Sequence, residues 1–359
     1  MSTSLEKAKN RLDRIIDKAR VDLYKPVQVA EVLRKSREDE SLNISDLDSY
    51  RNPSVKWRDT VTMKLTGKRS SSSARYQHDL WNDTAMPPTI LEVLDRENKD
   101  TGGAVERYVY MRYQERQGMV TRAIVSVEKA TAQDFQLRGL LEAFVAQPGI
   151  RRSVDKAYEI VVHSLFETLV VALEATVKVR VPETSRGLIE EFPDLSRVLL
   201  GLSPGSLQFE QPAHIYRVGV TNAADRGLDM WSNFGPAIQV KHLTLSERLA
   251  EEVVDKVESD HIVIVCRDID AKTIETITKQ IGWGNRVRGI VRESELIHWY
   301  ELCLRGRFAD RLATPLLDGL RTGFEAEFPQ SANIADFLAE RGYLDLDPTE
   351  LWLTESEKM

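Results

Sequence analysis

Residues Gly227 to His242 decide the fold, and they read Gly-Leu-Asp-Met-Trp-Ser-Asn-Phe-Gly-Pro-Ala-Ile-Gln-Val-Lys-His. The pattern predicts a strand, a tight turn around residues 233–236 and a second strand. Side chains alternate along a strand, so Gln239 and Lys241 share one face. Folding the two strands together brings Asp229 opposite that pair. A carboxylate, an amide oxygen and a lysine held in this way can bind a metal ion or a phosphate group.

The same residue types also occur in an ordinary β-hairpin without a functional site. Three other features of the sequence distinguish the two interpretations. Asp229 is an acidic residue in what otherwise reads as a core strand. Gln239 and Lys241 interrupt an apolar run, where a buried polar group without a partner costs free energy. The pattern of a strand, a helix and a further strand follows, as an enclosing α/β core requires. These features together favour a functional site.

The composition is that of a globular protein large enough for more than one domain. The chain has 359 residues, of which 42% are hydrophobic and 29% charged. It contains no run of about 18 apolar residues that predicts a membrane span, and the first residues lack the apolar core of a signal peptide. Its two cysteines, Cys266 and Cys303, suggest neither a disulfide framework nor a zinc site. We therefore expect a cytoplasmic protein.

Charge is unevenly distributed along the chain. The net charge is -7, but residues 51–75 hold seven basic residues and one acidic residue. Enzymes of nucleic acids often combine a basic binding face with an acidic surface elsewhere, although a solvated loop explains a lone basic cluster as well. If DNA is the partner, we expect Lys68, Arg69 and Arg75 to contact phosphates, in a Ser-rich segment that becomes ordered on binding.

The sequence predicts three regions. Residues 1–150 read as mainly helical with one β-hairpin, whose arms are residues 107–114 and 119–128, and we assign this region to DNA contact or dimerisation. Residues 151–300 read as an α/β core with a mixed sheet flanked by helices. Its expected elements are a helix over 153–175, strands over 176–181, 215–220, 261–266 and 287–291, and the hairpin of 229–241. Residues 301–359 read as a helical C-terminal extension.

The spacing of Asp229, Gln239 and Lys241 resembles the signature of the PD-(D/E)xK nuclease superfamily, with Gln in place of the second acid. More narrowly, Gly219 to Trp231, reading Gly-Val-Thr-Asn-Ala-Ala-Asp-Arg-Gly-Leu-Asp-Met-Trp, together with Ile-Gln-Val-Lys-His at 238–242, looks like the HaeII family of type II restriction endonucleases. The segments Ala-Tyr-Glu-Ile-Val-Val at 157–162 and His-Ile-Val-Ile-Val-Cys at 261–266 support the resemblance.

The resemblance implies a fold and an activity. The fold is an α/β, PD-(D/E)xK-type mixed-sheet core. The activity is Mg²⁺-dependent hydrolysis of both strands of double-stranded DNA at a short palindrome, RGCGCY, by a homodimer. A cognate DNA methyltransferase is the implied genetic partner.

The chemistry of the side chains suggests their roles. Asp229 is the expected anionic ligand of Mg²⁺, with the Gln239 amide oxygen and the Val240 backbone carbonyl beside it. Lys241 is expected to hold the attacking water and to offset charge on the scissile phosphate. Because Gln239 leaves the site one negative charge short, we expect Glu159 on the preceding helix to contribute. Glu167 is the alternative, roughly 80° around the helix from Glu159, and both acids can also simply face solvent.

Sequence-specific contacts need polar side chains on an element that enters a groove. Asn222, Arg226 and Asn233 lie close to the predicted site and are candidates for DNA binding. Two other functions remain open at this point. One is a modification-dependent or repair nuclease on the same core, and the other is a DNA-binding protein that has lost its catalytic activity.

Overall fold

The computed structural model describes residues 3–19, 23–39, 41–67, 80–146, 154–218, 228–246, 248, 250, 259–268, 273, 276, 287–328 and 334–358. The chain divides into two compact units. Unit 1 comprises Met1–Lys129, Gly139–Lys156 and Phe324–Met359, and unit 2 comprises Ala130–Arg138 and Ala157–Gly323. In the described part of the chain, every helix is too short or too polar to span a membrane.

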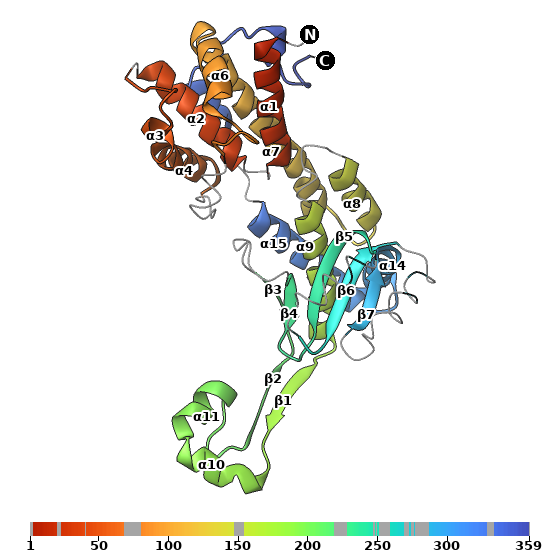
Figure 1. The fold of residues 1–359 in the computed structure, drawn as a ribbon. Coiled ribbons are helices and arrows are strands. Elements are labelled where there is room, and N and C mark those ends of the chain that lie inside the picture. Colours follow the sequence, from red (N-terminus) through yellow and green to blue (C-terminus); the bar gives the residue numbers. More distant parts are fainter. Residues whose placement is uncertain are drawn as a thin grey trace. The chain divides into compact units, whose positions relative to one another are not determined.

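Unit 2 is built on a five-stranded sheet with the order β3-β4-β5-β6-β7 (Figure 1). The strands are β3 (Ile215–Arg217), β4 (Met230–Ser232), β5 (Ala237–Thr244), β6 (Ile262–Arg267) and β7 (Val287–Arg292). The first three strands are antiparallel, whereas β5, β6 and β7 are parallel. The predicted mixed sheet with helices around it is therefore confirmed.

The helices of unit 2 are α9 (Val154–Ala172), α14 (Glu293–Arg305) and α15 (Ala309–Glu327). Helix α9 is fastened on two sides, because Tyr300 on α14 donates to the Val161 carbonyl at 2.8 Å and the His163 ring lies 2.9 Å from the Ile215 carbonyl on β3. Helix α15 comes very close to α9 at Gly323, where an added Cβ would lie 2.7 Å from Ile160. These contacts hold α9 in place beside the first strand of the sheet.

Residues Thr176–Pro212 form an arm in which β1 (Thr176–Arg180) pairs antiparallel with β2 (Gln208–Pro212), as Figure 1 shows. Between the strands lie η2 (Glu183–Ser185), α10 (Arg186–Glu191) and α11 (Pro193–Leu200). We expected residues 176–181 to belong to the core sheet, and this was wrong: among the described strands, β1 pairs only with β2. Its alternation of valine with charged residues suits a two-stranded ribbon as well as a core strand.

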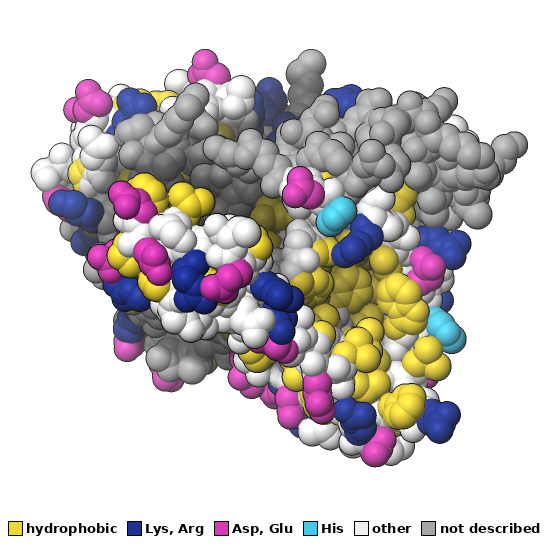
Figure 2. Space-filling view, turned by 90° about the horizontal axis from the view of Figure 1, so that it is seen from below, with side chains coloured by type: hydrophobic (Ala, Val, Ile, Leu, Met, Phe, Trp, Pro, Cys, Tyr) yellow, Lys and Arg dark blue, Asp and Glu magenta, His cyan; other side chains and the backbone are white. Residues whose placement is uncertain are grey.

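The arm carries an exposed apolar surface. Figure 2, seen from the side on which α10 and α11 lie in Figure 1, shows hydrophobic side chains gathered among charged ones. Six large hydrophobic side chains of α10, α11 and the residue between them are at least 42% exposed: Leu188, Phe192, Leu195, Val198, Leu199 and Leu200. Such a concentration is unusual on a surface that only meets water.

Unit 1 is helical. Its elements are α1 (Ser4–Lys18), α2 (Tyr24–Glu38), α3 (Leu47–Tyr50), α4 (Pro53–Thr66), α6 (Pro88–Asp100), α7 (Ala104–Glu128), most of α8 (Leu137–Ala146), α16 (Ile334–Glu340) and η3 (Glu350–Trp352). The hairpin expected over 107–128 was wrong, because these residues belong to the 25-residue helix α7. Tyr108, Val109 and Tyr110 are all buried, so α7 is enclosed on several sides. A helix packed on several sides carries large residues at consecutive positions. Here that packing overrides the β propensity of the tyrosines and valines that we interpreted as a strand.

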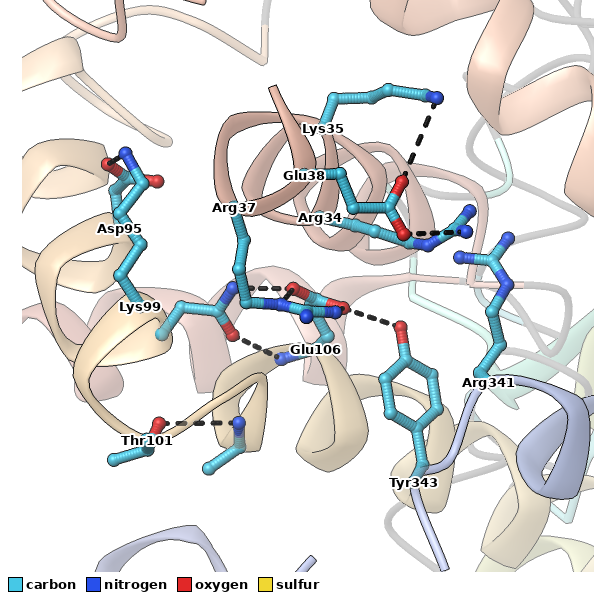
Figure 3. Close-up of polar contacts among 12 residues, drawn as sticks. Arg34, Lys35, Arg37, Glu38, Asp95, Lys99, Thr101, Glu106, Arg341 and Tyr343 are labelled. Atoms are coloured by element: carbon cyan, nitrogen blue, oxygen red, sulfur yellow. Dashed lines mark hydrogen bonds and ion pairs between the residues drawn. The ribbon is translucent and has the colours of Figure 1, made fainter. Parts of the chain in front are cut away.

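A buried polar cluster holds the helices of unit 1 together (Figure 3). Glu106 on α7 is fully buried and accepts hydrogen bonds from Arg37 at 2.9 and 3.0 Å, from Asn98 at 2.5 Å and from Tyr343 at 2.6 Å. The Glu106 carboxylate raises the pKa of Arg37, chiefly through the hydrogen bond between them. Burial raises the pKa of Tyr343 well above its ordinary value, and Glu106 adds to this. The cluster is thus a fully bonded structural unit.

Candidate active site

The hairpin of β4 and β5 places the predicted residues together. In its register Met230 faces Ile238 and Trp231 faces Ala237. Continuing this register by one pair sets Asp229 opposite Gln239, on the same face. Gly235 in the connecting turn has φ +120°, a conformation that glycine adopts without strain. The predicted hairpin geometry is confirmed.

Asp229 and Gln239 make direct contact. One carboxylate oxygen of Asp229, Oδ2, accepts a hydrogen bond from the Gln239 side-chain Nε2 and a second one, at 2.7 Å, from the Val240 backbone N–H. The Asp229 backbone carbonyl accepts from the Val218 N–H at 2.9 Å. Asp229 is therefore anchored to strands on both of its sides, and its carboxylate is oriented by β5.

Gln239 is the unusual residue of this pair. It is 1% exposed, and its buried amide oxygen Oε1 has no hydrogen-bond partner among the residues that the structure describes. Its neighbour on β6 is Ile264, which is fully buried and offers no polar side-chain atom. A buried carbonyl oxygen without a partner loses free energy relative to water. An unsatisfied group of this kind in a native fold calls for an explanation, and a ligand that binds there supplies one.

Lys241 lies two residues further along β5, beside Cys266 of β6. Its side chain is partly buried, and the described residues contain no ion-pair or hydrogen-bond partner for its ammonium group. The register of β5 and β6 shifts directly after Lys241. Burial raises the pKa of the Cys266 thiol to about 11, so this neighbour is an uncharged thiol at neutral pH. Lys241 therefore remains the predicted cationic group of the site.

The two acids of α9 have different surroundings. Glu167 accepts the Ile215 N–H at 2.7 Å and lies 2.7 Å from the His214 ring, so it fixes the start of β3. Glu159 is 4% exposed, and its Oε2 lies 4.0 Å from Arg217 on β3. Arg217 faces Met230, the residue after Asp229. Glu159 therefore lies beside the β3–β4 edge that carries Asp229, and its catalytic role remains a proposal.

Arg217 is a residue that the sequence reasoning missed. It ends β3, and its guanidinium is largely buried next to Glu159. The available signal was Glu159 itself, an acid inside an apolar helical run. An isolated buried acid is costly, so such an acid predicts a nearby basic partner.

The donors of this site suit a hard divalent cation. The Asp229 carboxylate and the unpartnered Oε1 of Gln239 are both oxygens, which Mg²⁺ prefers as ligands. Within the described ranges, no three His, Cys, Asp or Glu side chains form a group able to hold a metal ion. The Asp229 carboxylate would therefore share a metal ion with at most one other such side chain of this part of the chain, and the remaining positions would be filled by amide or backbone oxygens or by water. The Val240 carbonyl remains the predicted backbone donor.

The residues predicted to bind DNA are only partly described. Lys68, Arg69, Arg75, Asn222 and Arg226 lie outside the described residues. Asn233 is in the turn of the hairpin, where its amide donates to the Pro212 carbonyl at 2.9 Å and accepts from the His214 N–H at 2.8 Å. This side chain therefore ties the hairpin to the end of the arm, and its contact with DNA remains a prediction.

Part of the basic segment 51–75 has a structural role. Arg58 is 1% exposed and binds Asp59 at 2.7 Å and Gln28 at 3.2 Å. Lys64 pairs with Glu340 of α16. These two cations are used inside unit 1, so the free charge of the segment is smaller than its composition indicates.

The mixed sheet, the helix α9 before it and the Asp…Gln-x-Lys hairpin together define a PD-(D/E)xK-type nuclease core. The family model for "HaeII restriction endonuclease" matches residues 8–343. The chain therefore belongs to the HaeII family of type II restriction endonucleases, which are site-specific deoxyribonucleases.

Two curated relatives match over nearly their whole lengths. The type II restriction enzyme HaeII of Haemophilus aegyptius is 45% identical over 333 residues, covering 93% of this chain and 94% of the relative. The type II restriction enzyme NgoBI of Neisseria gonorrhoeae is 43% identical over 346 residues, covering 96% and 98%. No solved structure matches the chain significantly.

Proposed function

We propose that this chain cleaves both strands of double-stranded DNA at a short palindromic site by hydrolysing phosphodiester bonds, and that it requires Mg²⁺. The observation that carries the proposal is the buried pair of Asp229 and Gln239, in which the Gln239 Oε1 has no partner. Membership of the HaeII family and the names of the two relatives support DNA as the substrate. The family resemblance suggests RGCGCY as the target.

Each residue of the hairpin has a chemical task in this proposal. Asp229 and the Oε1 of Gln239 would hold the metal ion, with the Val240 carbonyl as a further oxygen ligand. A bound divalent cation supplies Lewis-acid polarisation of the phosphate and lowers the pKa of a coordinated water. The Gln239 Nε2 and the Val240 N–H keep the Asp229 carboxylate oriented. Lys241 positions the attacking water and offsets the negative charge that grows on the phosphate oxygens.

Glu159 is proposed to supply the negative charge that Gln239 lacks. Its burial next to Arg217 favours it over Glu167, which is engaged with the backbone of Ile215. Cleavage by Glu159→Gln and Glu167→Gln variants tests this assignment. Loss of cleavage in the first variant, with a rising Mg²⁺ requirement, supports Glu159. If only Glu167→Gln lost activity, the assignment would be wrong.

The cellular setting follows from the activity. An enzyme that cuts DNA at a short site endangers the DNA of its host, so we propose a cognate DNA methyltransferase as its genetic partner and the cytoplasm as its location. Cutting both strands of a palindrome in one binding event takes two catalytic centres related by a twofold axis, and the described hairpin provides one per chain. We therefore propose that the enzyme acts as a homodimer.

The proposal is tested by incubating the purified protein with unmethylated phage DNA and Mg²⁺. Discrete fragments, with RGCGCY at every cut when the ends are sequenced, are the expected result. Cleavage of methylated or branched DNA alone would instead show a modification-dependent or repair nuclease. Binding without any cleavage would show a protein that has lost the reaction.

A further inference from the structure

The arm Thr176–Pro212 has little interior of its own. Every residue of β1 and β2 is at least partly exposed, and a two-stranded ribbon alone is marginally stable in water. Helix α11 has no buried residue, and within the arm only Ile189 of α10 and Leu202 after α11 are buried. The arm therefore gains little stability from the chain that carries it, which suggests that another surface covers it.

The exposed apolar side chains of the arm form pairs that lie on the same side of a helix. Leu188 and Phe192 are four residues apart, as are Leu195 and Leu199, and this spacing puts each pair on the same side of a helical turn. Val198 is 74% exposed and Leu199 69% exposed. Long apolar side chains at these spacings are typical of a helix that packs against a partner.

A second group of exposed apolar side chains lies on the body of unit 2. It consists of Leu169, Val171, Leu173, Tyr216, Trp231 and Phe234, which are 40–67% exposed. The rings of Tyr216 and Trp231 stack across β3 and β4 with their centroids 4.6 Å apart. Counting both groups, twelve of the seventeen exposed large hydrophobic residues in the described part of the chain lie between residues 169 and 234. One segment therefore carries most of the exposed apolar surface.

The charges of the arm's helices do not suit DNA. Arg186 and Arg197 each pair with an acidic residue three positions earlier on the same segment. Glu190 and Glu191 are exposed. A surface of leucines, valine and carboxylates repels phosphates, whereas it suits the apolar centre and polar rim of a protein contact.

We propose that a second copy of this chain covers the arm, so that the arm is the homodimer contact. A twofold dimer brings the same surfaces of both copies together, and the chain offers two uncovered apolar groups that can cover each other in this way. A stable dimer needs roughly 800 Å² from each partner, and the six exposed side chains of α10 and α11 together with the stacked rings of Tyr216 and Trp231 supply apolar surface for such a contact. This places dimerisation on the arm and not on residues 1–150.

The inference rests on the proposed function in one respect, which is the need for two catalytic centres. Its test requires neither DNA nor metal. Analytical ultracentrifugation of the full-length protein should show a dimer, and Leu195→Glu/Leu199→Glu should weaken the dimer at least 100-fold. Leu302→Glu and Leu344→Glu are matched controls, because these leucines are 50% and 55% exposed outside the segment. Both controls should remain dimeric.

A second measurement does not depend on a disruptive change. Cys266 and Cys303 are buried and burial raises the pKa of both thiols, so a cysteine introduced by Val198→Cys is the fast-reacting thiol. Its reaction with a thiol reagent should slow as protein concentration rises through the dimerisation range. The thiol of Leu344→Cys should react at one rate throughout. A wild-type monomer at all concentrations, a dimeric Leu195→Glu/Leu199→Glu variant, or unchanged reactivity at position 198 would each overturn the proposal.

DNA cleavage assays distinguish a failure of the proposed dimer contact from a failure of the proposed function. Asp229→Asn should remain a dimer while losing cleavage. The monomeric arm variant should bind Mg²⁺ as wild type does but should convert supercoiled plasmid mainly to the nicked form. If wild type is dimeric through the arm yet cuts no DNA, the interface stands and the proposed function fails.

Discussion

Two buried polar clusters, one in each unit, differ in whether their central side chain has hydrogen-bond partners for its buried oxygen atoms. Around Glu106 in unit 1, the carboxylate receives hydrogen bonds from Arg37, Asn98 and Tyr343. Around Gln239 in unit 2, the side-chain nitrogen donates to Asp229, but the buried amide oxygen has no partner in the described part of the chain. Both side chains are at most 1% exposed. The first cluster is complete within the protein, whereas the second has a vacant acceptor.

This difference separates a structural cluster from a functional one. A buried polar group that has all its hydrogen bonds contributes to stability and specificity of packing. A buried acceptor without a partner, next to a carboxylate and a lysine, is better explained by a ligand that binds there. Substitutions in unit 1 should therefore change stability, and substitutions in the hairpin should change activity.

After the loss expected from changes at Asp229 itself, the largest expected effect is on the reaction rate of Lys241→Ala. Removing a group that stabilises charge in a transition state lowers rates by roughly 10²–10³-fold, and Lys241 is also proposed to hold the attacking water. Because the described residues offer this ammonium no partner, the free energy of unfolding should change by less than about 0.5 kcal/mol. Single-turnover cleavage and denaturant unfolding measure the two quantities. A fully active variant would remove Lys241 from the mechanism.

Glu106→Ala should show the opposite behaviour. It leaves the half-buried Arg37 and the buried Asn98 and Tyr343 without their acceptor, and leaving a buried ion pair or hydrogen-bonded group without its partner costs up to about 3–5 kcal/mol. Hydrogen exchange of the slowest amides of unit 1 measures this loss. Glu38→Ala is the matched control: Glu38 pairs with Arg34 at 2.8 Å on the surface, and exposed pairs contribute about 0–1 kcal/mol. Equal losses in the two variants would contradict the comparison.

Gln239→Glu should convert the incomplete cluster into a stronger metal site. The added carboxylate lies against Asp229, so without metal the two negative charges repel each other and lower the melting temperature. With metal, the extra charge should lower the Mg²⁺ concentration for half-maximal cleavage about tenfold, or about 1.4 kcal/mol. Melting temperatures in EDTA and in Mg²⁺ test both parts. An unchanged Mg²⁺ requirement would show that residue 239 does not face the metal.

The smallest effect concerns pH. Burial lowers the pKa of His163 below its ordinary value of 6.5, so the folded state takes up a proton less readily than the unfolded state. The stability that neutral His163 contributes is present above pH about 6.5 and is lost as the pH falls below it. His163→Gln should flatten the fall in melting temperature between pH 7 and pH 5. His298→Gln, which changes an exposed histidine, should not.

Local patterns were sufficient to predict the hairpin of β4 and β5. The alternation of Gln239 and Lys241 fixes their common face, and the turn residues fix the pairing with Asp229. The mixed sheet followed from short apolar strands such as β6. These features depend on neighbouring residues in the sequence, so a single sequence contains them.

Features that depend on distant contacts were not predictable in this way. Helix α7 was interpreted as a hairpin because Tyr108 and Tyr110 alternate with other residues, and only the packing of unit 1 shows that consecutive residues are buried. The pairing of β1 with β2 depends on segments about 30 residues apart. The contact of Glu159 with Arg217 joins helix α9 to strand β3, and the whole arm lies between them in the sequence. Each of these is decided by tertiary structure, which overrides local propensity.

The most direct test of the central claim is cleavage of unmethylated phage DNA by Asp229→Asn. This change keeps the size of the side chain and removes the negative charge that is proposed to hold Mg²⁺. We expect loss of all detectable fragments, with melting temperature and DNA binding in Ca²⁺ close to those of the wild type. An Asp229→Asn enzyme that still produced the wild-type fragments in Mg²⁺ would contradict the account, because the active site would then lie elsewhere in the chain.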